Sequence, residues 1–217
     1  MKKMIGALMS LTLGLSGPAM ADPKIDNWHT YHSMGCMMLG ECTEGVNKID
    51  GVSTLGKGFS PFADELGNIF ESLDLIGVEA YLADAKYFKH NTRGLYDVTR
   101  NTFFLNKKYL DQPEVLVSVI RHEGWHIAQD CMAGTLDNTF TAVILQDGTV
   151  PDWISSTALK TYKEKAAPYE AEAMYAAFLD GHTASALAAC ASAVPMWETY
   201  EPTPLTRIWL NKNGFIR

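Results

Sequence analysis

Two histidines and a glutamate lie close together in the stretch VLVSVIRHEGWHIAQDC, residues 115–131. His122 and His126 are four residues apart, so on a helix their side chains share one face and both imidazoles can reach one metal ion. Glu123 stands beside them, and a carboxylate next to a bound metal accepts a proton from an activated water molecule. The pattern H-E-x-x-H therefore predicts a site for Zn²⁺, with His122 and His126 as ligands and Glu123 as the general base of a hydrolysis.

The alternative is a pair of core histidines that have ordinary hydrogen-bond partners. In a chain with this content of histidine and glutamate, the motif arises by chance with a probability of about 1%. Three ionisable groups within five positions of an apolar helix are also costly to bury unless something organises them. Both arguments favour metal binding.

An apolar pattern around the motif predicts the helix that carries it. Apolar residues recur at three- and four-residue steps from Val115 to Ile127. Asp111 is a candidate N-cap, Pro113 suits the first turn, and the helix is expected to end near Met132. The motif thus lies in the second half of a mostly buried helix.

Other elements follow from similar patterns. Ser60 and Pro61 suit the start of a helix that ends near Gly77. Aromatic and β-branched residues predict two extended stretches, 78–88 and 94–106, the second with a turn at residues 97–101. Residues 133–157 form a long connection with a possible short strand at 140–146, and three further helical stretches follow, 157–165, 166–181 and 183–194.

This combination resembles the HExxH zinc metallopeptidases, the zincins. The stretch GLYDVTRNTFFLN, residues 94–106, looks like the edge strand that aligns a peptide substrate in those folds, and it precedes the HExxH helix as it does there. Met132 stands where the metzincin branch has a third histidine, which excludes that branch. The later stretch YEAEAMYAAF resembles the helix from which gluzincins take a glutamate ligand. The resemblance implies an α+β, zincin-like fold with a small antiparallel sheet packed on the HExxH helix and further C-terminal helices.

Two glutamates in the later helix compete for the role of third ligand. Glu170 and Glu172 are turned by about 200° from each other, so only one can face the metal. Alanines share the face of Glu170 and permit close approach of the HExxH helix, so Glu170 is preferred and Glu172 is kept as the alternative. Many gluzincins have Asp or Asn four residues after this ligand. This chain has Met174 there, which leaves the partner that orients the ligands open.

The N-terminus has the pattern of a secretory signal peptide. Lys2 and Lys3 precede an apolar run that is too short for a good membrane span, and small residues at 19–21 suit cleavage after Ala21. We expect a secreted or periplasmic protein with three regions: a signal peptide, 1–21, an irregular segment, 22–58, and a zincin-like metallopeptidase domain, 59–217. No later stretch is long and apolar enough to cross a membrane. The net charge of −7 offers no basic patch for nucleic acid.

All four cysteines lie in the part expected to be exported, where disulfide bonds form. Four cysteines allow three connectivities, and the sequence does not choose among them. One possibility is a small loop closed by Cys36 and Cys42, which leaves Cys131 to pair with Cys190. No spacing matches a zinc–thiolate site.

The function that the resemblance implies is an exported zinc metallopeptidase whose substrate is a peptide or protein. The alternative is a non-catalytic exported protein of zincin-like fold with a binding or structural role, and a weaker one is a zinc hydrolase acting on a non-peptide bond. Residues that stabilise the transition state in such enzymes are commonly Tyr, His or Arg. The candidates in this chain are Tyr162, Tyr169, Tyr175 and His182, while His29, His32 and His90 are weak candidates for any role.

Overall fold

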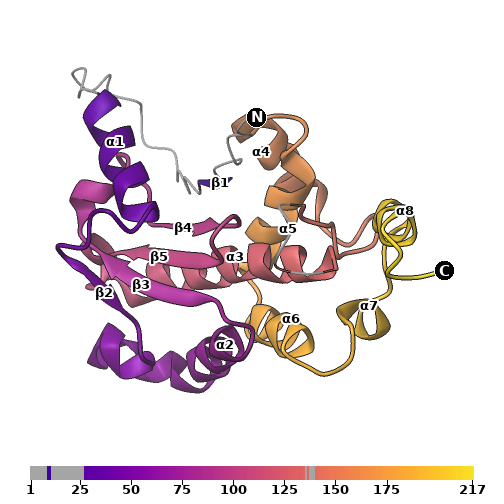
Figure 1. Cartoon of the computed structure of the whole chain (residues 1–217), viewed down its shortest axis with the longest axis horizontal. Coiled ribbons are helices and arrows are strands. Elements are labelled where there is room, and N and C mark those ends of the chain that lie inside the picture. Colours follow the sequence, from indigo (N-terminus) through magenta and orange to yellow (C-terminus); the bar gives the residue numbers. More distant parts are fainter. Residues whose placement is uncertain (1–8, 11–26, 135, 137–139) are drawn as a thin grey trace.

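The helix that carries the HExxH motif forms where the apolar pattern predicts it. In a computed structural model, which describes residues 9–10, 27–134, 136 and 140–217, α3 spans Pro113–Met132 (Figure 1). Its N-cap is Gln112 rather than Asp111, and Pro113 lies in the first turn, where no backbone N–H is required. Most of its side chains from Leu116 onwards are buried, because helices pack on one side of α3 and the sheet on another.

The sheet contains four strands of three to five residues and a two-residue strand at one edge. They are β1 (Met9–Ser10), β2 (Val46–Lys48), β3 (Glu79–Ala83), β4 (Gly94–Asp97) and β5 (Thr102–Asn106), in the spatial order β1-β4-β5-β3-β2. The protein is therefore a mixed α and β structure, as predicted. β4 and β5 are the two arms of the expected hairpin, with Leu95 opposite Phe104.

The prediction of an antiparallel sheet was wrong at one pairing. β3 and β5 run parallel, with Tyr81 opposite Phe104. The reason is topological: β4 runs opposite to β3 but lies one strand further away, and β5 returns between them. β5 is therefore antiparallel to β4 and parallel to β3.

The two faces of the sheet pack against different helices. Phe103 and Leu105 of β5 join a core with α3 and α2 (Ala63–Leu75), whereas Phe104 points to the opposite face, towards Met34 and Met37 of α1 (Asn27–Met38). This separation follows from the two-residue period of a strand. Since α3 lies against the first face, its motif is held between the sheet and the C-terminal helices.

The N-terminal segment is more regular than predicted. Part of residues 22–58, expected to be irregular, forms α1. The apolar residues of this segment do not recur at a clear helical spacing, so a helix was not predicted. Met34 and Met37 nevertheless lie three residues apart and pack against the sheet. The helix expected at 60–77 begins with a 3₁₀ turn over Lys57–Phe62, which places Pro61 before α2 proper.

The C-terminal half is helical, and five helices follow the long connection. They are α4 (Asp152–Thr161), α5 (Ala167–Ala176), α6 (His182–Cys190), α7 (Met196–Thr199) and α8 (Pro204–Lys212). The short strand predicted at 140–146 does not form over the described residues of that stretch. Backbone amides there bond to α3 and to a side chain of α5 instead, for example Ala142 N–H to the Gln129 carbonyl.

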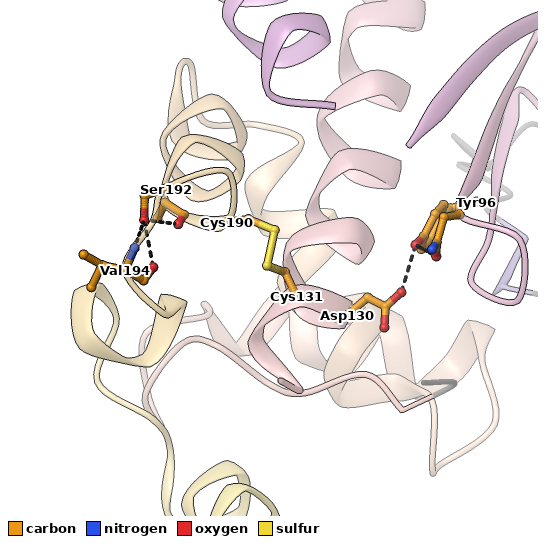
Figure 2. The surroundings of a disulfide bond; sticks show 8 residues. Tyr96, Asp130, Cys131, Cys190, Ser192 and Val194 are labelled. Carbon is orange, nitrogen blue, oxygen red and sulfur yellow. Dashed lines mark hydrogen bonds between the residues drawn. A yellow bond between two sulfur atoms is a disulfide. The ribbon is translucent and has the colours of Figure 1, made fainter. Parts of the chain in front are cut away.

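Two disulfide bonds are present, Cys36–Cys42 and Cys131–Cys190. The second joins the end of α3 to the end of α6 (Figure 2). Disulfide bonds indicate an oxidising, extracellular type of environment. Among the described helices, none has both the length and the apolar character needed to cross a bilayer. The predicted signal peptide lies outside the described residues except for β1, which pairs with β4.

Candidate metal centre

The two motif histidines meet on one face of α3, as their four-residue spacing predicts. Their Nε2 atoms are 3.1 Å apart, and the rings stand at 84° to each other. Both side chains are at most 1% exposed. Two imidazole nitrogens therefore point to the same small volume inside the protein.

The third group comes from α5, which packs against α3. Glu170 places its Oε2 atom 3.4 Å from Nε2 of His122 and 3.7 Å from Nε2 of His126. The approach is close because the neighbouring residue on the same face, Ala173, has a small and fully buried side chain. The structure therefore brings together the three residues predicted as ligands, His122, His126 and Glu170.

The dimensions of this group fit a divalent metal ion. Ligand atoms at about 2.0–2.1 Å from a tetrahedral zinc are about 3.3–3.4 Å from one another. The three separations here, 3.1, 3.4 and 3.7 Å, lie around that value. The buried Oε2 atom of Glu170 makes no hydrogen bond within the described part of the chain, so a cation is the partner that its position suits. A metal ion would be held by two imidazoles and one carboxylate.

Burial and mutual charge shift the pKa values of the three groups in different directions. Burial tends to raise the pKa of Glu170, but its contacts with both histidines lower it to about 2. Burial lowers the pKa of His122 to about 4. Burial also tends to lower the pKa of His126, but the nearby carboxylate of Glu170 outweighs burial and raises it to about 9. Metal binding would replace the proton of His126, because a ligand nitrogen must carry a free lone pair.

Glu123 lies beside the ligand group but is not part of it. Its side chain is fully buried, and neither carboxylate oxygen has a hydrogen-bond partner among the described residues. Burial raises the pKa of Glu123 to about 8, while the charge of His126 and the nearby backbone N–H of Tyr96 oppose this shift. Glu123 therefore faces β4 from α3, with oxygens that are free to take a proton.

Glu172, the alternative ligand, is equally buried but lies in another environment. Its Oε2 atom accepts hydrogen bonds from the Trp125 indole N–H at 3.3 Å and from the Ile144 backbone N–H at 3.1 Å, and its Oε1 atom accepts one from the Leu145 backbone N–H. The prediction that only one of the two glutamates faces the site agrees with this arrangement. Glu172 connects α5 to α3 and to the chain before α4.

The HExxH motif did not predict the roles of two further polar residues of α3, Gln129 and Asp130. Nδ1 of His126 lies 2.8 Å from Oε1 of Gln129, whose three-residue spacing from His126 was an available signal. Asp130 is fully buried and accepts a hydrogen bond from the Tyr96 hydroxyl at 2.8 Å (Figure 2). Burial raises the pKa of Asp130 to about 8, and the bond from Tyr96 lowers it only in part.

The remaining candidates lie in other surroundings. The ring of His182 stacks on Trp125, with centroids 4.9 Å apart, and burial lowers the pKa of this histidine. His32 and His90 have exposed side chains, unlike the buried ligand group. The side chain of His29 lies outside the described residues. The backbone carbonyl of Tyr169 accepts a hydrogen bond from Gln129.

Comparisons with known proteins do not assign the chain to a family. No protein-family model matches it, and comparison with curated proteins and with solved structures gives no match either. A function for this chain is therefore inferred from its residues and their geometry.

Proposed function

We propose that this chain is an exported, zinc-dependent metallopeptidase of zincin-like fold that hydrolyses peptide bonds. The observation that carries the proposal is the convergence of His122, His126 and Glu170 on one small volume beside the carboxylate of Glu123. Three protein ligands leave one position of a tetrahedral zinc open, which is typical of catalytic rather than structural zinc sites. Zinc, when bound, supplies Lewis-acid activation of water and of a carbonyl group.

Glu123 has the properties of the general base in this reaction. Its oxygens make no hydrogen bond to the described residues, so they can accept a proton from the attacking water and pass it to the leaving amine. Burial and the charge of Glu170 outweigh the charge of His126 and raise the pKa of Glu123 to about 8, and a bound metal cation would lower it. These opposing effects favour a group that is ionised near neutral pH and still basic enough to take the proton.

β4 is the strand at which a peptide substrate would bind. It lies at the edge of the sheet apart from its two-residue pairing with β1, which belongs to the predicted signal peptide. The backbone N–H of Tyr96, in the middle of β4, is close enough to Glu123 to lower its pKa. A peptide that added to β4 as a further strand would therefore run past the proposed base.

A non-catalytic metal-binding protein is the second candidate. The observation that favours it is the depth of the site, because all three ligands and Glu123 are at most 1% exposed. A peptidase must admit its substrate to the metal, whereas a protein that only holds a metal ion need not. Both functions predict that the protein binds the metal, but only the peptidase is expected to cleave members of a peptide library.

The test begins with the mature protein from Asp22 and a measurement of zinc by mass spectrometry. We expect about one zinc per chain in the wild type and none in the double variant His122→Ala/His126→Ala. Full occupancy of that double variant would refute the metal site. Glu123→Gln should retain zinc and lose most of its peptide cleavage, by about 10²-fold or more. Stoichiometric zinc without cleavage of any peptide would instead favour the non-catalytic function.

A further inference from the structure

Gln129 lies one turn after His126 on α3 and contacts that histidine on the side away from Glu170. Its Oε1 atom is 2.8 Å from Nδ1 of His126, while the Nε2 atom of the same imidazole points to the ligand group. The amide nitrogen of Gln129 has two acceptors, Oε2 of Glu172 at 2.7 Å and the carbonyl of Tyr169 at 3.1 Å. All three contacts are with helix α5 or α3.

These contacts determine which way the amide of Gln129 points. Rotating it by 180° would place its oxygen against a carboxylate and a carbonyl, both of which are acceptors only. The oxygen must therefore face His126, and since it cannot donate, Nδ1 of His126 must carry the hydrogen. A neutral imidazole protonated at Nδ1 presents its lone pair at Nε2, the atom that faces His122 and Glu170.

Glu172 is held too firmly to let Gln129 turn. Besides Gln129 it accepts hydrogen bonds from Trp125 and from the backbone amides of Ile144 and Leu145. These donors belong to α3 and to the connection before α4, and Glu172 itself belongs to α5. Hydrogen bonds from α3 and from the connection thus hold the carboxylate of Glu172 in place. Glu172 in turn holds the amide of Gln129 in the orientation that faces His126.

We propose that Gln129, locked by Glu172, is a positioning residue that holds His126 in the tautomer and orientation needed for metal binding. This inference rests on the proposed metal site and adds the residues that organise it. Many gluzincins have an Asp or Asn four residues after the glutamate ligand, where this chain has Met174. Gln129, on the same helix as His126, supplies an orienting contact in place of that residue. Partners of this kind typically change metal affinity by about 10–100-fold.

The first experiment measures zinc affinity by competition with a chelating indicator. Gln129→Met keeps the length of the side chain and removes both the acceptor and the donors, and we expect it to bind zinc about 10–100-fold more weakly than the wild type. Thr183→Val is the control, because it removes a different buried hydrogen bond to α3, from the Thr183 hydroxyl to the Arg121 carbonyl. The control should lose stability and keep its zinc affinity, which separates positioning from a merely structural role.

The second variant is Gln129→Glu. A carboxyl group at 129 accepts from Nδ1 of His126 with one oxygen and, when protonated, donates to Glu172 with the other, while Glu172 keeps its own bonds from Trp125 and the connection. We expect zinc affinity within about threefold of the wild type. If Gln129→Met does not fold, this variant decides the question, since a loss of affinity there would overturn the inference.

A third readout does not depend on affinity. In ¹⁵N-labelled, zinc-loaded wild type, the Nδ1–H proton of His126 should be visible by NMR and protected from exchange, and in Gln129→Met it should exchange faster. Wild-type protein that binds no zinc would overturn both this inference and the proposed function. Wild-type binding together with an unchanged affinity and an unchanged Nδ1–H signal in Gln129→Met would overturn the inference alone.

Discussion

The hydroxyl of Tyr96 donates a hydrogen bond to Oδ2 of Asp130 across a distance of 2.8 Å, and this bond joins strand β4 to α3, the helix of the two candidate histidine ligands (Figure 2). Tyr96 also lies against Glu123 through its backbone N–H. Glu123 and Asp130 are seven residues apart and so share one face of α3. A single residue of β4 thus contacts both buried carboxyl groups of that face.

Asp130 makes the stability of the protein depend on pH. Its pKa is raised to about 8 in the folded protein, mainly by burial, against an ordinary value of 3.8. The folded state therefore binds a proton that the unfolded state has lost, so this contribution is fully present below pH 3.8 and disappears as pH rises through 8. We expect Asp130→Asn to be more stable than the wild type at pH 8, with a smaller decline in the free energy of unfolding between pH 5 and pH 8.

The measurement is urea unfolding of the zinc-free proteins at several pH values. Asp74→Asn is the matched control, because it removes the same charge from an exposed position on α2. The control should follow the wild-type pH dependence. An Asp130→Asn profile parallel to that of the wild type would show that Asp130 is ionised in the fold.

The two glutamates of α5 should respond differently to substitution. Glu170→Gln removes a ligand charge and should weaken zinc binding by about 10²-fold or more. Glu172→Ala should lower the free energy of unfolding by about 3 kcal/mol or more, because it leaves several buried N–H donors without an acceptor. Added zinc should raise the melting temperature of the wild type and of Glu172→Ala but not of Glu170→Gln. The reverse pattern would identify Glu172 as the ligand.

Gly124 lies where α3 and α6 pack closely together. A Cβ atom at this position would lie 2.8 Å from Cγ2 of Thr183 and 3.4 Å from Cδ1 of Leu187. Gly124→Ala improves helix propensity by about 1 kcal/mol, yet the clash should make the variant about 1–3 kcal/mol less stable overall. Thr183→Ser removes Cγ2 and keeps the hydroxyl that bonds to Arg121.

The double variant Gly124→Ala/Thr183→Ser therefore tests the cause of the clash. Gly124→Ala should cost much less stability when residue 183 is Ser than when it is Thr. Thermal unfolding of the four proteins gives the coupling between the two positions. Additive effects would show that contact with Cγ2 of Thr183 is not the cause of the lost stability.

The two disulfide bonds should contribute unequally to stability. Cys131 and Cys190 are 59 residues apart, and Cys36 and Cys42 only six. Loop-closure entropy predicts that removing the longer-range bond costs about 4 kcal/mol and the shorter one about 2 kcal/mol. The paired variants Cys131→Ala/Cys190→Ala and Cys36→Ala/Cys42→Ala, compared in urea unfolding, measure this difference. Equal losses would argue against loop closure as the main source of stability.

Local patterns predicted the elements whose contacts are close in sequence. The apolar spacing from Val115 to Ile127 placed α3 within a residue or two, and the hairpin of β4 and β5 formed because its two arms are separated by a short turn. α1 was missed because its polar and apolar residues do not alternate with a helical period. The prediction of a strand at 140–146 was wrong because backbone N–H groups of this stretch donate hydrogen bonds to α3 and α5 and not to another strand.

The sequence alone determined that His122 and His126 share one face and that Glu123 lies beside them, because the geometry of a helix fixes the relation between residues one turn apart. The tertiary structure decided the rest of the site. Glu170 rather than Glu172 joins the histidines, Gln129 orients His126, and Tyr96 reaches Asp130, since each of these relations depends on how α5 or β4 packs against α3. Such contacts between distant segments are set by the packing of the whole core and by no local period.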